Sequence, residues 1–307
     1  MFHFFRFFIP ILILLYSLPI RVQAEMLAPP KLGQVMKENE KLQRLQRVQS
    51  RFKKTSITLP TPSIRSLSYQ TLLSGKSVTL TKYDALDLWV QEVNLNKWWK
   101  LESILTLGGY DEVNGEPLFE KKKLNEVLSS LPKKPFSIIN GQFFDPKKTI
   151  TPLSFWVKVD GVVRTAGSDN RNESKNILIL EEGRARIVPY SWENLRDAPG
   201  YMAIVNLSLA KSHYKNENIG RTYICLKNPN SSNESSDLLI FTAVAIDEPT
   251  IENELIRWGC TRESSSKLDS SGSTRLLING EYIYGNSHGG NPDYRKIPHS
   301  LAIYDAE

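Results

Sequence analysis

From about residue 66 onward, the sequence consists of short apolar runs separated by turn-forming dipeptides, and this spacing limits the possible folds more than any other feature. Runs of about four to eight β-branched and aromatic residues are typical of strands, and a glycine dipeptide such as Asp-Gly or Asn-Gly between two runs is typical of a hairpin. On this basis, hairpins are predicted over residues 155–163, 177–188 and 276–284.

Further strands and two helices complete the prediction for this part of the chain. The strands are expected at residues 77–81, 86–93, 136–139, 223–226, 238–246 and 301–304. The helices are expected at residues 119–131, where apolar side chains share one face before Pro132 ends the run, and at residues 251–258. This mixture predicts an α+β domain over residues 66–307.

The first 24 residues are typical of an export signal. One cation, Arg6, precedes an apolar run of about a dozen residues, and Ala24 places a small residue at the expected cleavage point. An uncleaved membrane anchor is the alternative, but a span needs about 18 or more apolar residues and Arg21 ends this run early. The chain is therefore expected to be exported, periplasmic or extracellular, and to be held at a membrane only if the signal is not removed.

Residues 25–65 are predicted to form a basic helical arm and a proline-rich linker. Apolar side chains three or four apart favour a helix over residues 34–53, and Pro60 and Pro62 prevent it from continuing. The whole chain has a formal net charge of +6; residues 31–54 alone carry +6, and residues 55–307 carry −1. This distribution argues against nucleic-acid binding and leaves two interpretations of the arm, a solvated helix or a contact with an anionic envelope polymer.

Cys225 and Cys260 are either a disulfide pair or two buried thiols. Export permits the pairing, which closes a loop of about 35 residues. Two cysteines are too few for a structural zinc site, and the sequence contains no His-Glu-x-x-His motif or phosphate-binding loop, so no metal or other cofactor is expected. The absence of a Gly-x-Ser-x-Gly motif argues against an ordinary serine hydrolase.

Three polar stretches interrupt the strand pattern. They are Asn140-Gly141-Gln142-Phe143-Phe144-Asp145, Gly220-Arg221-Thr222 and Leu268-Asp269-Ser270-Ser271-Gly272-Ser273. Each of them alone is explained by ordinary structural chemistry, as an Asx turn, an edge-strand cation and a turn cap respectively. Their occurrence in this order is the stronger signal.

Together these stretches resemble the phosphodiester glycosidase domain family, which includes a lysosomal uncovering enzyme and bacterial proteins associated with exopolysaccharide. Family members carry Asn-Gly-Gly-Phe-Phe-Asp, Arg-Thr and Leu-Asp-Gly-Gly-Gly-Ser segments, a Pro followed by an Asp-Gly hairpin, and an Arg-x-x-Pro before the last strand. The last two are matched by Pro152 with Asp160-Gly161, and by Arg295-Lys296-Ile297-Pro298. The resemblance covers residues 75–304.

The resemblance implies an α+β fold around a polar cleft and hydrolysis of a sugar-1-phosphodiester in an envelope polysaccharide or glycoconjugate. It implies that Asn140, Arg221 and Asp269 converge as catalytic residues, with Arg221 on the phosphate and Asp269 at the anomeric carbon as acid–base group or nucleophile. Asp145 is the candidate if a second carboxylate is needed, although a turn role explains it as well. The substrate, a carbohydrate or phosphoglycan, would meet Thr222, Phe144, Gly272, Ser273, Arg295 and His288.

The sequence departs from the family pattern at three positions. Gln142, Ser270 and Ser271 replace glycines, which permit positive φ and close backbone approach to a ligand more readily than other residues. A reshaped loop would fit a second hypothesis, an exported glycan-binding protein without catalysis. His288, in a glycine-containing loop, is either an acid–base group at the cleft or a surface residue.

Overall fold

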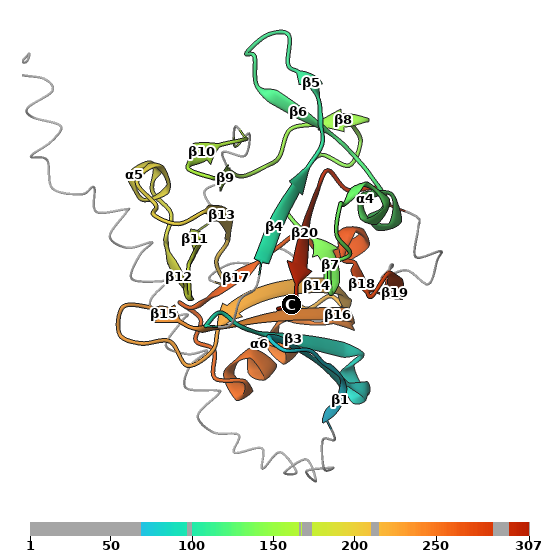
Figure 1. Cartoon of the computed structure of the whole chain (residues 1–307), viewed down its shortest axis with the longest axis vertical. Helices are drawn as coiled ribbons and strands as arrows, with labels where there is room; N and C mark the ends of the chain where they lie inside the picture. The colour runs from blue at the N-terminus through green and yellow to red at the C-terminus, as the bar shows by residue number, and fades with distance from the viewer. Residues whose placement is uncertain are drawn as a thin grey trace, which may run out of the picture. The chain divides into compact units, whose positions relative to one another are not determined.

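The computed structural model describes residues 69–96, 100–165, 167, 174–209, 215–284 and 295–306. These residues belong to one compact unit that runs from Ser66 to Glu307. The predicted export signal, the basic arm and His288 lie outside the described residues. Strands dominate the described part (Figure 1), so the fold is sheet-rich and fits the predicted α+β class only loosely.

The largest sheet is antiparallel and draws its strands from the whole length of the described chain. Its strands, in the order in which neighbours pair, are β1 (Tyr69–Ser74), β2 (Val78–Tyr83), β3 (Leu88–Asn94), β16 (Asp237–Ile246), β14 (Ile219–Leu226), β17 (Ser265–Lys267), β13 (Met202–Leu207), β11 (Lys175–Glu181), β12 (Arg184–Pro189) and β15 (Glu234–Ser235). A side branch, β9 (Val157–Val159) with β10 (Val162–Val163), pairs with β13.

Two smaller antiparallel sheets and a few short helices accompany it. One sheet orders β19 (Glu281–Tyr284), β18 (Leu276–Ile278), β7 (Ser137–Asn140), β20 (His299–Tyr304) and β4 (Lys100–Leu105); the other orders β5 (Leu107–Tyr110), β6 (Pro117–Glu120) and β8 (Ile150–Thr151). The described helices are α4 (Leu124–Ser130), α5 (Trp192–Arg196) and α6 (Glu248–Arg257), with 3-10 turns η1 (Asp84–Leu86) and η2 (Ser271–Ser273). None of them combines the length and apolar character that a membrane span requires.

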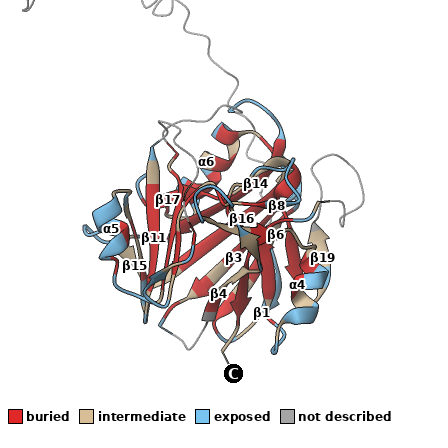
Figure 2. Ribbon diagram, turned by 90° about the horizontal axis from the view of Figure 1, so that it is seen from above, coloured by how far each residue is buried: buried red, intermediate tan, exposed pale blue. Residues whose placement is uncertain are grey.

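The two larger sheets pack face to face, and a helix covers the outer side of each. Ile224 of β14 and Ile139 of β7 belong to the apolar core between the sheets. Helix α6 packs on the far side of the first sheet through Ile251, and α4 packs on the far side of the second through Leu124 and Val127. Figure 2 accordingly shows buried residues concentrated in the strands and exposed residues on the outer turns of α4 and α5.

The three predicted hairpins are confirmed as β9–β10, β11–β12 and β18–β19. In the first, Asp160 and Gly161 have φ values of 50° and 76°, and in the third Asn279 and Gly280 have 51° and 91°. Two left-handed residues in succession are what a tight two-residue hairpin turn requires, which is why these dipeptides predicted the turns correctly.

The predicted helix boundaries were partly wrong. The helix expected at residues 119–131 begins at Leu124, because Phe119 pairs in β6 with Leu107 and with Thr151. The helix expected at residues 251–258 begins earlier, at Glu248, because the Asp247 side chain caps it by accepting a hydrogen bond from the backbone N–H of Thr250 at 2.7 Å. Helix α5 and several strands, including β1, β4 and β13, were missed; all six residues of β13 are buried, so that strand shows no polar alternation.

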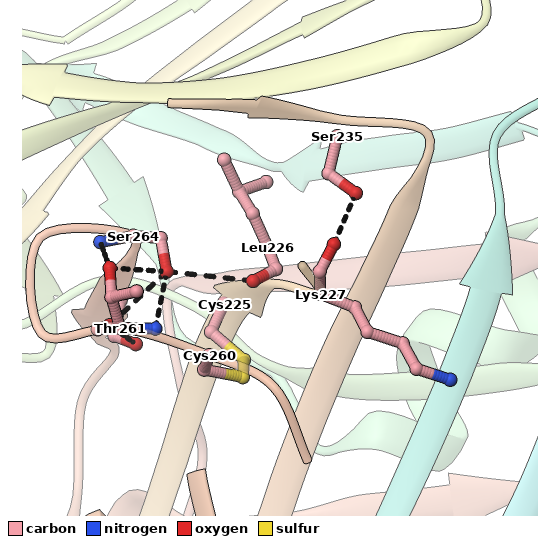
Figure 3. The surroundings of a disulfide bond; sticks show 8 residues. Cys225, Leu226, Lys227, Ser235, Cys260, Thr261 and Ser264 are labelled. Carbon is pink, nitrogen blue, oxygen red and sulfur yellow. Dashed lines mark hydrogen bonds between the residues drawn. A yellow bond between two sulfur atoms is a disulfide. The ribbon is translucent and has the colours of Figure 1, made fainter. Parts of the chain in front are cut away.

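Of the two alternatives for the cysteines, the structure contains the disulfide. It joins Cys225, on β14, to Cys260, just beyond α6, and their Cα atoms are 6.0 Å apart (Figure 3). The adjacent backbone is also tied together, since the N–H of Leu226 donates to the carbonyl of Ser264 at 2.9 Å. The bond therefore fastens the helix layer to the central strand of the largest sheet.

Reduction of this disulfide is expected to lower the free energy of unfolding by about 3–4 kcal/mol, because the unfolded chain regains the entropy of a loop of about 35 residues. Urea unfolding with and without a reductant measures the difference. The double variant Cys225→Ala/Cys260→Ala is the control and should not respond to the reductant. Equal urea midpoints for the oxidised and reduced wild-type protein would contradict the expectation.

Candidate functional site

A single buried amide joins the three polar stretches. The Asn140 Nδ2 group donates to the carbonyl of Asp269 at 2.7 Å, while its Oδ1 accepts from the Thr222 hydroxyl at 2.7 Å and from the backbone N–H of Arg275 at 3.1 Å. Asn140 and Thr222 are each 1% exposed. Both residues therefore hold the Asp269 loop in place and do not present their polar groups to solvent.

Strand geometry explains how these residues meet. Asn140 is the last residue of β7, in the second sheet, and Thr222 lies on β14 on the face that packs toward that sheet, together with Ile224. Side chains alternate between the two faces of a strand, so Arg221 and Tyr223 lie on the opposite face, under α6.

Arg221 is engaged within the protein and does not join Asn140 and Thr222. Its Nε donates to the carbonyl of Ile246 at 2.7 Å and its Nη2 to the carbonyl of Glu217 at 3.0 Å, and the residue is 2% exposed. The convergence of Arg221 with Asn140 on one face, implied by the family resemblance, is therefore absent, because the two neighbouring residues of β14 point to different layers.

Arg221 belongs instead to a buried polar cluster beneath α6. Lys267 forms an ion pair with Glu248, and the Tyr223 hydroxyl donates to Glu248 Oε1 at 3.2 Å. Burial lowers the pKa of Lys267, although the Glu248 carboxylate opposes this shift. Burial, followed by the charge of Glu248, raises the pKa of Tyr223 well above its ordinary value, so its phenol remains a donor.

The half-buried residues of the Asp269 loop are the accessible part of the arrangement. Asp269 is fixed by its backbone N–H, which donates to the carbonyl of Gly141 at 3.0 Å, and its Oδ1 accepts from the N–H of Ser270 at 2.8 Å. The Arg295 guanidinium packs on Gly272, where an added Cβ would lie 2.9 Å from Arg295 Cζ, and its Nη1 lies 3.3 Å from Ser273 Oγ. The guanidinium of Arg295, which lies shortly before β20, thus contacts the short loop that carries Asp269.

His299 and Gln142 support this loop; in the sequence, Gln142 was named only as a departure from the family pattern and His299 was not singled out. The His299 ring accepts the backbone N–H of Gln142 at Nδ1, 3.0 Å away, so its Nε2 carries the proton and donates to Ser103 Oγ at 2.8 Å. An added Cβ on Gly141 would lie 2.3 Å from His299 Nδ1, so this position needs glycine. The Gln142 amide donates to the carbonyl of Val205 in β13. No spacing in the sequence signals these contacts, which join distant strands.

The remaining predicted residues have structural roles where they are described. Phe144 pairs with Leu153 in an isolated bridge and packs against two of the apolar cores. Asp145 accepts the backbone N–H of Lys147 at 3.0 Å, as a turn residue does. Among the residues that the structure describes, no group of three or more His, Cys, Asp and Glu side chains is placed to hold a metal ion.

No family model and no curated protein matches this sequence. Among solved structures, the chain is similar to the catalytic domain of zebrafish N-acetylglucosamine-1-phosphodiester alpha-N-acetylglucosaminidase, auto-inhibited by its pro-peptide. The identity is 16%, the match covers 78% of this chain and 81% of that one, and the TM-score is 0.52. This chain shares that fold.

Two further solved structures show weaker likenesses. A hypothetical protein from Synechocystis is 8% identical over 78% of this chain and 64% of its own, with a TM-score of 0.44. A protein from Burkholderia pseudomallei is 8% identical over 74% of both chains, with a TM-score of 0.40.

Ser270 and Ser271, two positions at which the family resemblance leads us to expect glycine, differ in backbone conformation. Ser271 has a φ of 57°, in the left-handed region, whereas Ser270 is extended with a φ of −132°. A left-handed conformation costs a residue with a Cβ about 1–2 kcal/mol, and glycine in extended backbone loses about 0.5–1 kcal/mol. The variant Ser271→Gly should therefore be more stable than its matched control Ser270→Gly by about 1–2 kcal/mol in urea unfolding. Equal stabilities would show that Ser271 is not strained.

Burial lowers the pKa of His299 from 6.5 to about 3. Between these values the unfolded chain binds a proton at His299 that the folded protein does not. The free energy of unfolding is therefore unaffected by His299 above about pH 6.5 and decreases as the pH falls below that value. Between pH 7.5 and 5 the loss should be about 2 kcal/mol. Urea unfolding across this range measures it, and His299→Gln should unfold with a pH dependence smaller by that amount. An unchanged pH dependence in the variant would refute a buried neutral His299.

Proposed function

We propose that this chain is an exported glycosidase that hydrolyses a sugar-1-phosphodiester at the Asp269 loop. The observation that carries the proposal is the half-buried Asp269, whose backbone is held by Asn140 and Gly141 on a short loop that the Arg295 guanidinium contacts at Gly272 and Ser273. The shared fold with the zebrafish phosphodiester glycosidase domain supports this reaction class. The signal-like residues 1–24 support export to an envelope where phosphate-linked glycans are available.

In the proposed reaction, the bond between the anomeric carbon and the phosphate oxygen breaks and the phosphate leaves with the electron pair. Asp269 acts at the anomeric carbon, either by taking a proton from the attacking water or as the nucleophile of a covalent intermediate that water then opens. The products are the free sugar and a phosphate monoester. A phosphate monoester is a good leaving group, so the reaction needs only one well-placed carboxylate and a cation that binds the phosphate.

We assign the phosphate to Arg295 and not to Arg221. The Arg295 guanidinium is partly exposed, and it packs over Gly272, which has no side chain to cover it. A planar guanidinium can hold two phosphate oxygens and stabilise the charge that develops on the leaving group. Arg221 donates to backbone carbonyls in the interior, which gives it a positioning role for the ends of β14 and β16.

The second candidate is a glycan-binding protein without catalysis, and the burial of Arg221 favours it. In this interpretation the departures at Gln142, Ser270 and Ser271 have reshaped the loop. The Gln142 side chain is fully engaged at its Nε2 with Val205 and Asn206 and fills the space beside them. The two candidates share a sugar site and differ in whether Asp269 does chemistry.

The variant Asp269→Asn separates them. An asparagine Oδ1 can still accept the N–H of Ser270, so the loop should keep its shape, but the group can no longer take a proton or attack the anomeric carbon. Release of free sugar from a panel of hexose- and N-acetylhexosamine-1-phosphate diesters should fall by about 10²-fold or more, while binding of the diesters measured by calorimetry stays within a few-fold of wild type.

Asp111→Asn is the matched control, because Asp111 also accepts backbone N–H groups in a turn, those of Val113 and Asn114, on the β5–β6 hairpin. It should leave the rate unchanged. If the wild-type protein hydrolyses no diester of the panel but binds some of them, the glycan-binding candidate replaces the enzyme. Absence of both activities overturns both candidates.

A further inference from the structure

A groove of about 520 Å³ lies between two hairpins. Strand β4 leads into the β5–β6 hairpin, and the β9–β10 hairpin forms the other wall (Figure 1). The walls are mainly apolar, and the lining includes Leu107, Tyr110 and Phe119 from the first hairpin and Val159 and Val162 from the second. The volume is within the range of small-molecule sites, about 300–1,000 Å³.

The apolar lining is unusually accessible. Leu107 is 51%, Tyr110 63% and Val162 49% exposed. Exposing large apolar side chains together around a hollow is unfavourable in water, and such surfaces commonly bind an apolar ligand. The lining also includes the exposed cation Arg164 and no carboxylate. A hydrocarbon chain with an anionic head matches this combination.

A series of hydrogen bonds connects the groove wall to the Asp269 loop. Ser103, in the lining, meets His299 at 2.8 Å, and the carbonyl of His299 accepts the backbone N–H of Gly141 at 3.0 Å. The carbonyl of Gly141 in turn accepts the N–H of Asp269 at 3.0 Å. These hydrogen bonds run through His299, which is 1% exposed, and the buried Gly141, so the wall of the groove is connected to the Asp269 loop through the protein interior.

We propose that this groove binds the hydrocarbon chain of an anionic amphiphile whose phosphate head lies on Arg164. The inference goes beyond the proposed function and does not depend on it, because no residue of the Asp269 loop lines the groove. Occupancy of the groove can be measured without hydrolysis.

Calorimetric titration of the Asp269→Asn protein with monomeric alkyl phosphates of increasing length tests the groove. The dissociation constant should fall by up to about fourfold for each added methylene, as burial of hydrocarbon predicts, and then level off when the groove is full. The alcohol of the same length should bind more weakly than the phosphate. In the variant Arg164→Gln, the alkyl phosphate and the alcohol of the same length should have similar dissociation constants.

Leu107→Asp should weaken binding of the longest alkyl phosphate by about tenfold or more, because it places a carboxylate in the groove wall. Ile256→Asp is the matched control: Ile256 is also an exposed apolar residue, 60% exposed, but lies on α6 and outside this groove. It should bind as wild type does. Both variants change exposed positions, and thermal unfolding checks that each is folded.

The outcomes distinguish this inference from the proposed function. Suppose that short diesters are hydrolysed, that a longer chain does not increase the rate, and that no alkyl phosphate binds. This result overturns the proposal for the groove and leaves the proposed glycosidase function intact. Alkyl phosphate binding that loses its length dependence in Leu107→Asp supports the groove even if no diester is hydrolysed. Binding to phosphatidylglycerol vesicles without binding to monomeric alkyl phosphates makes the hairpins a membrane-contact surface and overturns the inference.

Discussion

The buried amide of Asn140 is the interaction on which the candidate site depends. It sits where β7 ends between the two larger sheets, and three of its hydrogen bonds hold β14, the Asp269 carbonyl and the start of β18 together. A buried amide left without these partners costs about 1–3 kcal/mol for each unsatisfied group, so the loop and the two sheets are fixed in relation to one another. The loop that carries Asp269 has a defined position because this amide is satisfied in that arrangement.

The alternation of side chains along β14 divides the polar residues between two layers. Thr222 faces the second sheet and supports the Asp269 loop, whereas Arg221 and Tyr223 face α6 and form a cluster with Glu248 and Lys267. The division changes the assignment of roles: the accessible cation that contacts the Asp269 loop, at Gly272 and Ser273, is Arg295, and Arg221 is part of the support for α6. The disulfide between Cys225 and Cys260 fastens the same helix layer farther along the strand.

Sequence reasoning was most successful where the signal is local. The Asp160-Gly161 and Asn279-Gly280 turns require left-handed backbone at both positions, and these dipeptides adopt it at low cost, so the hairpins could be predicted from two residues. It was least successful where packing decides. Phe119 fits a helical pattern but pairs in β6, and β13 has no alternation because both of its faces are covered. His299 has no distinguishing neighbours in the sequence and acquires its role only from Ser103 and the backbone of Gln142.

The sequence by itself determined the hairpin-rich character of the chain and the three polar stretches at strand ends, because turn preferences and strand periodicity act over a few residues. It also carries the resemblance through which Asp269 and Arg295 were singled out. The tertiary structure decided which of these residues face the same space, because the face of a side chain follows from register and from the layers on each side. It placed Arg221 away from Asn140, brought His299 beneath Gly141, and formed an apolar groove from two hairpins about 50 residues apart in the chain, a combination that local preferences cannot encode.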